Sequence, residues 1–144
     1  MTTSILELRW RVRPGGGGRT ERKYLDFVVD DESLHDQLRV GDQVTALGCW
    51  PPASERKHIQ QLLSASGRIP PYVCAECGDL GCGAITVLVE RTLDGFVWRD
   101  FAFENKYDAS MTDAESYRAV GPFVFNNREY WQVLNERATS LSAS

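Results

Sequence analysis

The sequence predicts an α+β fold: a mainly antiparallel sheet with two main helices, and a Cys-rich turn that leads into a central hairpin. Three observations predict it. Apolar and polar residues alternate in the first segment, two further alternating segments flank an Asp-Gly turn signal at residues 94–95, and two longer segments have the apolar spacing of amphipathic helices. The 144 residues, 42% of them hydrophobic and 25% charged, suit a single globular domain over residues 1–144.

The first expected element is an antiparallel hairpin. One strand covers residues 5–13 and the other covers residues 23–29, because each alternates between apolar and polar residues. Between them lies a Gly-rich loop at residues 14–18, which lacks the Lys-Ser/Thr ending of a phosphate-binding loop. The expected buried face of the first strand consists of Leu6, Leu8, Trp10 and Val12.

Basic residues cluster on this hairpin, and two interpretations of them stay open. Either the polar faces of two neighbouring strands are simply cationic, or they form a docking face for an acidic partner. The whole chain is acidic, with 16 basic and 20 acidic residues and a formal net charge of −4, which argues against nucleic-acid binding. The clustered residues are Arg9, Arg11, Arg13, Arg19, Arg22 and Lys23.

The middle of the chain predicts a short helix, a short strand and the first main helix. Ser33 caps the short helix over residues 33–38, and the strand follows at residues 44–48. A Pro-Pro pair starts the main helix, which covers residues 51–66. Its apolar stripe consists of Ile59, Leu62 and Leu63, whereas Glu55 and His58 are expected to face water.

The central hairpin covers residues 84–90 and 96–103, and both of its faces carry apolar residues. We therefore expect it in the middle of the sheet, covered on one side by helices, with Trp98 in the core. Asp100 is expected to be mostly buried in this hairpin, and a buried aspartate needs a partner. Two interpretations remain for it: an ion pair with an arginine, or a functional carboxylate.

The second main helix begins after Asn126, a favourable N-cap with Glu129 three residues later. Phe125 and Tyr130 stand at the positions of a hydrophobic staple. Trp131 is expected in the core. The tail at residues 139–144 is expected to be frayed.

The Cys turn over residues 74–83 reads CAECGDLGCG and carries the clearest chemical signal. Cys74, Cys77 and Cys82 have Cys-x₂-Cys-x₄-Cys spacing, and the glycines between them allow tight folding around one ion. A structural Zn²⁺ site needs four ligands, so the fourth must come from elsewhere in the chain. Cys49 is the first candidate, followed by His58 and His35, whereas Asp79 would be an unusual ligand.

Other interpretations of this turn remain open. The cysteines could exchange a disulfide, although glycines and a strand follow them rather than the helix that would lower a thiol pKa, and Glu76 and Asp79 would raise it. They could also simply pack as small apolar residues under a tight turn. A metal-dependent hydrolase would need Asp79 or Glu76 as its general base.

Residues 72–103 and 121–131 resemble a family of small, functionally uncharacterised bacterial proteins. The resemblance lies in the Cys-x-x-Cys-Gly-Asp-x-Gly-Cys-Gly motif of the Cys turn, in Trp-x-Asp-Phe at residues 98–101, and in Gly-Pro-Phe-x-Phe at residues 121–125. It implies a shared fold and a shared Cys turn. Some members are labelled oxidoreductase, but this sequence has no dinucleotide-binding glycine pattern.

The function that these features favour is a non-catalytic protein-binding module in the cytoplasm, with zinc in its Cys turn. We expect no signal peptide, because arginines interrupt the apolar residues at the N-terminus, and no membrane span, because no apolar run reaches about 18 residues. The expected partner is another protein, and toxin neutralisation of the immunity type is the specific version. Trp50, Asp79 and Asp100 are the candidate binding residues, with Trp50 as an exposed anchor. The alternative is a thiol-disulfide oxidoreductase that uses Cys74 or Cys77 as its nucleophile.

Overall fold

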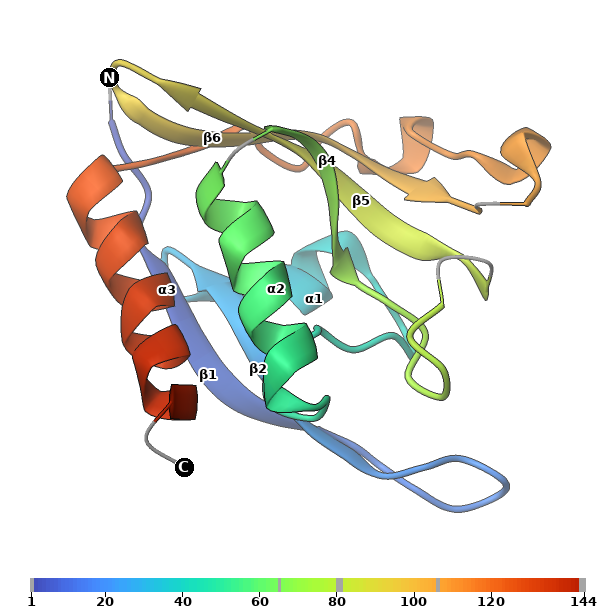
Figure 1. The fold of residues 1–144 in the computed structure, drawn as a ribbon. Helices are drawn as coiled ribbons and strands as arrows, with labels where there is room; N and C mark the ends of the chain where they lie inside the picture. The colour runs from blue at the N-terminus through green and yellow to red at the C-terminus, as the bar shows by residue number, and fades with distance from the viewer. Residues whose placement is uncertain (1, 65, 80–81, 106, 143–144) are drawn as a thin grey trace.

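The structure is a computed structural model that describes residues 2–64, 66–79, 82–105 and 107–142. Within these residues it has three α-helices and two antiparallel sheets, which confirms the predicted α+β class. The first sheet has the order β1-β2-β3 and the second has the order β4-β5-β6-β7. Figure 1 shows α2 and α3 side by side across the same side of the sheets.

The first sheet is the predicted hairpin with a short third strand. β1 (Leu6–Arg13) pairs with β2 (Arg22–Val29) in unbroken antiparallel register, and β3 (Glu32–Ser33) adds two residues. The expected burial of β1 is wrong at its outer end, where the side chains of Trp10 and Val12 are 51% and 52% exposed. Trp10 is covered only in part, by the Arg137 guanidinium at 5.7 Å and the Lys23 ammonium at 4.9 Å from its ring centroid. Beyond it, the hairpin extends past the two helices toward its glycine loop (Figure 1).

The second sheet contains the predicted central hairpin. β5 (Ala84–Thr92) pairs with β6 (Gly95–Glu104), and β4 (Ser66–Tyr72) and β7 (Phe123–Phe125) flank them. The strand expected at residues 44–48 is only a single bridge, between Val44 and Val73. The two sheets meet at the start of the chain, where the Ser4 amide donates to the Val124 carbonyl at 2.6 Å.

The main core lies between the sheets and the two long helices. Trp98 is fully buried there, as predicted, and its indole N–H donates to the Tyr130 hydroxyl at 3.2 Å. That hydroxyl in turn donates to the Leu62 carbonyl on α2 at 2.7 Å. Trp131 was expected in the core but is 52% exposed, because successive helical residues point about 100° apart and Tyr130 takes the inward position.

Two of the helices, α1 and α3, begin where their caps predict. Ser33 Oγ accepts the Asp36 amide at the start of α1 (Leu34–Leu38). α2 (Pro52–Ser64) ends before the expected residue 66. Asn126 Oδ1 accepts two backbone amides at the start of α3 (Asn127–Ser142), and the rings of Phe125 and Tyr130 stack 5.6 Å apart.

The tail differs from the expectation of fraying. α3 continues to Ser142, so residues 139–142 are helical, and Leu141 is buried at 9% exposure. An apolar anchor at the last turn gives the helix end a tertiary contact, which opposes fraying. Residues 143–144 lie outside the described residues. None of the described helices has the length and apolar run needed to cross a bilayer.

Candidate metal centre

The Cys turn connects β4 to β5 and is held by its own backbone. The Gly78 amide donates to the Cys74 carbonyl at 2.9 Å, and the Cys82 amide donates to the Asp79 carbonyl at 3.1 Å. Gly78 has a φ of +69°, a left-handed conformation that glycine adopts without a steric penalty. Ala75 packs against the small core cluster formed with Tyr24 and Val44. The sequence therefore folds this segment into a compact loop with its cysteines on one side.

The three thiols of the turn converge. The sulfur atoms of Cys74, Cys77 and Cys82 all lie within 4.8 Å of one another, and the sulfurs of Cys77 and Cys82 are 3.2 Å apart. Zinc–sulfur bonds of about 2.3 Å in a tetrahedron put ligand sulfurs about 3.8 Å apart. A small outward shift of two side chains would give the spacing that a Zn²⁺ ion requires. This cluster could hold a metal ion.

The surroundings of the cluster favour the thiolate form of Cys74 and disfavour the thiolate form of Cys82. Partial burial raises the pKa of Cys74, but hydrogen bonds from the backbone N–H groups of Cys77 and Glu76 and from the thiols of Cys77 and Cys82 together outweigh it. The net pKa of Cys74 is therefore lowered. Hydrogen bonds with Cys77 and Cys74 raise the pKa of Cys82 to about 12. A cation bound between the sulfurs would lower the pKa of Cys82, because a thiol that binds a metal ion is deprotonated.

The carboxylate of Glu76 was expected to raise the pKa of the thiols, but it is paired with the hairpin instead. Its carboxylate accepts from Arg13 at 2.6 Å and from both the amide and the hydroxyl of Thr20 at 2.8 Å, and its amide lowers the pKa of Cys74. Arg22 also donates to the Ala75 carbonyl at 2.8 Å. The β1–β2 hairpin thus holds the Cys turn through several contacts.

These contacts support the simpler interpretation of the basic cluster on the hairpin. Arg9 pairs with Asp31 at 2.7 Å, and Arg11 pairs with Asp36 at 2.9 Å. Arg13 is buried and pairs with Glu76 at 2.6 Å and with Asp42, in the turn that follows α1, at 3.0 Å. The arginines are therefore engaged within the chain rather than left for an acidic partner.

The structure does not bring Cys49 into the thiol cluster. Its sulfur contacts the Thr45 carbonyl at 3.8 Å, and burial raises its pKa. Trp50 is half-buried rather than an exposed anchor: its indole N–H donates to the Thr45 carbonyl at 3.1 Å, and the Arg22 guanidinium lies 4.5 Å from its ring centroid. Trp50 instead covers Gly78 of the Cys turn.

The two aspartates singled out from the sequence lie in different places. Asp79 is exposed in the Cys turn, and its amide donates to the Cys77 sulfur at 3.4 Å. Asp100 is exposed, not buried as expected, because a register shift in β5–β6 places it at φ +57°. The expected ion pair is present, with Arg99 at 2.8 Å. Asp100 lines a separate cavity and is not part of the Cys cluster.

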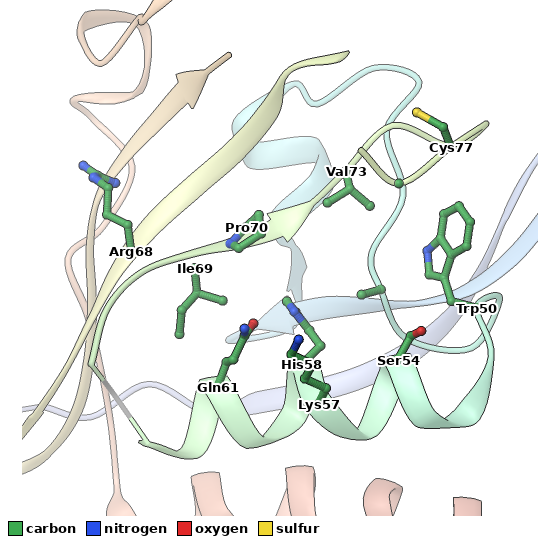
Figure 2. A pocket seen from close by; sticks show the side chains of 12 residues that line it. Trp50, Ser54, Lys57, His58, Gln61, Arg68, Ile69, Pro70, Val73 and Cys77 are labelled. Carbon is green, nitrogen blue, oxygen red and sulfur yellow. The ribbon is translucent and has the colours of Figure 1, made fainter. Parts of the chain in front are cut away.

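The sequence did not predict a cleft of about 580 Å³ between α2 and β4, which borders the Cys turn at Cys77 and Gly78 (Figure 2).

Two polar residues of α2 are buried against expectation. His58 and Glu55 were expected to face water, yet they are 6% and 1% exposed. Their spacing carried the signal, because Glu55, His58, Ile59 and Leu62 follow the three- and four-residue spacing of one helix face. Because Glu55 and His58 are polar, the sequence analysis assigned them to the solvent-facing side of the helix.

Comparison of the chain with models of known protein families, with curated proteins and with solved structures finds no match. The likeness of the Cys turn to small bacterial proteins therefore remains an expectation from the motif. The functional inference depends on the geometry of the three thiols.

Proposed function

We propose that this protein is a thiolate metal-binding protein whose Cys turn holds one Zn²⁺ ion through Cys74, Cys77 and Cys82. The observation that carries this proposal is the convergence of three sulfur atoms within 4.8 Å in a turn already folded around them. Soft thiolate ligands favour Zn²⁺ over the hard cations Mg²⁺ and Ca²⁺. The ion would fix the β4–β5 connection, which the hairpin holds from its other side.

We infer that the chain supplies three ligands and that solvent or a partner supplies the fourth. Among the residues that the structure describes, no further Cys, His, Asp or Glu side chain joins the cluster. The two turn residues outside the description, Leu80 and Gly81, have no ligating side chain. Both Cys77 and Cys82 are exposed, so the open side of the site is accessible to another molecule.

The proposed role is that of a non-catalytic protein-binding module in a reducing compartment such as the cytoplasm. Four free cysteines suit such a compartment, because clustered thiols there bind metal more often than they form structural disulfides. An exposed metal position beside half-buried Trp50 offers a partner both a coordination bond and an aromatic contact. The specific protein-binding role that we propose is neutralisation of a bacterial toxin, which the small size and net negative charge support.

A thiol-disulfide oxidoreductase is the second candidate, favoured by the 3.2 Å separation of the Cys77 and Cys82 sulfurs. One thiolate would attack a substrate disulfide, form a mixed disulfide and release the first substrate thiolate. The other thiolate would then close the Cys77–Cys82 disulfide and release the second, so the substrate gains the two electrons that the pair loses. The raised pKa of Cys82 disfavours this role, because the thiolate is the nucleophile.

The test is a metal and thiol count on protein purified without chelator. We expect about one zinc per chain, bound by three thiolates, and loss of that zinc in Cys74→Ser, Cys77→Ser and Cys82→Ser. Cys49→Ser is the matched control and should keep it. Equal zinc loss in the control, or metal-free protein with a Cys77–Cys82 disulfide that turns over a dithiol substrate, would overturn the metal proposal.

A further inference from the structure

His58 is a buried polar group that the Cys cluster does not use. It is 6% exposed on the inner face of α2, and among the described residues its Nε2 atom has no hydrogen-bond partner. Burial lowers its pKa to about 4, so the ring is neutral at physiological pH and one of its two nitrogens carries a proton. A buried polar atom without a partner is destabilising unless something binds it.

The cleft between α2 and β4 is the place where such a partner would sit. Figure 2 shows His58 projecting from α2 toward β4, across from Ile69 and Pro70. Val73 continues the apolar wall, and Trp50 closes the end near Cys77. A cleft of about 580 Å³ that combines apolar walls with several polar side chains has the size of a small-molecule site.

The positive charge at the cleft comes from Lys57. The lining of the cleft includes Lys57 and Arg68 but no aspartate or glutamate. Arg68 does not contribute free charge, because its guanidinium donates to Thr86 and to the Asp100 carbonyl and lies 3.9 Å from the Glu104 carboxylate. Lys57 is exposed and has no acidic partner among the described residues. An exposed ammonium beside an apolar cleft attracts an anion that also carries apolar surface.

We propose that this cleft binds a small organic carboxylate with a flat apolar body. The carboxylate accepts hydrogen bonds from the Lys57 ammonium and from the Nε2–H of His58, whose buried ring turns toward the cleft when the ligand binds. The apolar body lies against Ile69, Pro70 and Val73 and extends toward Trp50. The site is independent of the metal proposal, because only Cys77, at its edge, belongs to the thiol cluster.

The experiment is a titration of the full chain with 2-naphthoate, followed by calorimetry and by ¹⁵N NMR of the His58 ring. We expect saturable binding with a shift of the Nε2 resonance, and binding of the uncharged naphthalene-2-carboxamide weaker by about tenfold or more. Lys57→Gln should weaken 2-naphthoate binding by about tenfold, because it removes the charge-assisted contact.

Matched variants separate this site from general electrostatics and from the metal centre. Arg56→Gln removes the same charge from the same helix at an exposed position outside the cleft and should leave affinity unchanged. His58→Gln keeps a donor and should bind better than His58→Phe. The Cys82→Ser variant should bind 2-naphthoate with unchanged affinity even when it has lost zinc. No saturable binding, an unmoved Nε2 resonance, equal affinity for the amide, or equal effects of Arg56→Gln and Lys57→Gln would each overturn the proposal.

Discussion

Glu55 is a carboxylate near the start of α2 that the fold buries and fully neutralises. It is 1% exposed, and it accepts hydrogen bonds from the Gly48 amide at 2.8 Å and from two nitrogens of Arg137 at 2.6 and 3.2 Å. Arg137 lies on α3, so this single side chain ties two helices and the loop before α2 together. Removing one partner from a buried ion pair costs more than the pair contributes, because the other charge stays buried.

Arg137→Ala should therefore lower the free energy of unfolding by about 3 kcal/mol. Urea denaturation followed by tryptophan fluorescence measures it. Arg118→Ala is the control, because its pair with Glu115 is exposed and should contribute little. Equal effects of the two substitutions would show that burial of Glu55 is not the reason for the stability of this contact.

At the residue scale, the sequence predicted what depends on local spacing. Cys74, Cys77 and Cys82 converge as their spacing predicts, because the glycines between them allow the chain to fold tightly. The distant Cys49 was assigned to the same site, yet the path of the chain after Thr45 points its sulfur elsewhere. Asp100 was expected to be buried because its neighbours are apolar, and a one-residue shift in the ladder turned it outward.

Among the elements, the turn between β5 and β6 is tightly constrained. Gly95 has a φ of +142°, and a Cβ atom there would lie 2.0 Å from the Phe125 carbonyl oxygen. The crowding arises because β7 pairs with β6 directly beside this turn, with Phe96 opposite Phe125. A backbone atom cannot rotate away as a side chain can.

Gly95→Ala should lower the free energy of unfolding by about 3 kcal/mol or more, since it adds a backbone clash to a left-handed conformation. Gly41→Ala has a similar left-handed penalty but nothing within 4 Å of the new Cβ. It should cost about 1 kcal/mol. Thermal and urea unfolding of both variants gives the comparison, and a Gly95→Ala variant as stable as Gly41→Ala would contradict the packing of β7 against the turn.

The elements with strong local signals were predicted, and those formed only by tertiary pairing were not. The Asp-Gly turn and flanking alternation located β5–β6, and Asn126 located the start of α3. β7 is only three residues long and exists through pairing with β6, so no periodicity could reveal it. The segment at residues 44–48 has strand-like residues but finds only one bridge partner, in Val73.

For the whole molecule, two buried histidines link stability to pH. Burial lowers the pKa of His58 to about 4 and also lowers the pKa of His35. Between pH 6.5 and 4 the unfolded chain therefore binds more protons than the folded chain, and the free energy of unfolding falls as the pH is lowered. His58 alone accounts for up to about 3 kcal/mol of this loss.

A second decline follows at lower pH. Hydrogen bonds from Arg13 and Thr20 hold the pKa of Glu76 at about 2, below its ordinary 4.5. The stabilisation from the ionised Glu76 carboxylate is present above pH 4.5 and is lost as the pH falls toward 2. The hairpin should therefore release the Cys turn in that range. Urea midpoints of chelator-treated protein between pH 7 and 3 measure both declines. His58→Gln should flatten the first, and an unchanged slope would contradict the assignment.

The central claim is that three thiolates of one turn bind a zinc ion with one position left to solvent or a partner. X-ray absorption spectroscopy at the zinc edge tests it most directly, because it counts the sulfur neighbours of the ion. The account predicts three sulfur ligands at about 2.3 Å and one nitrogen or oxygen ligand. Four sulfur ligands would place Cys49 in the site after all, and two or fewer would contradict a site built by Cys74, Cys77 and Cys82.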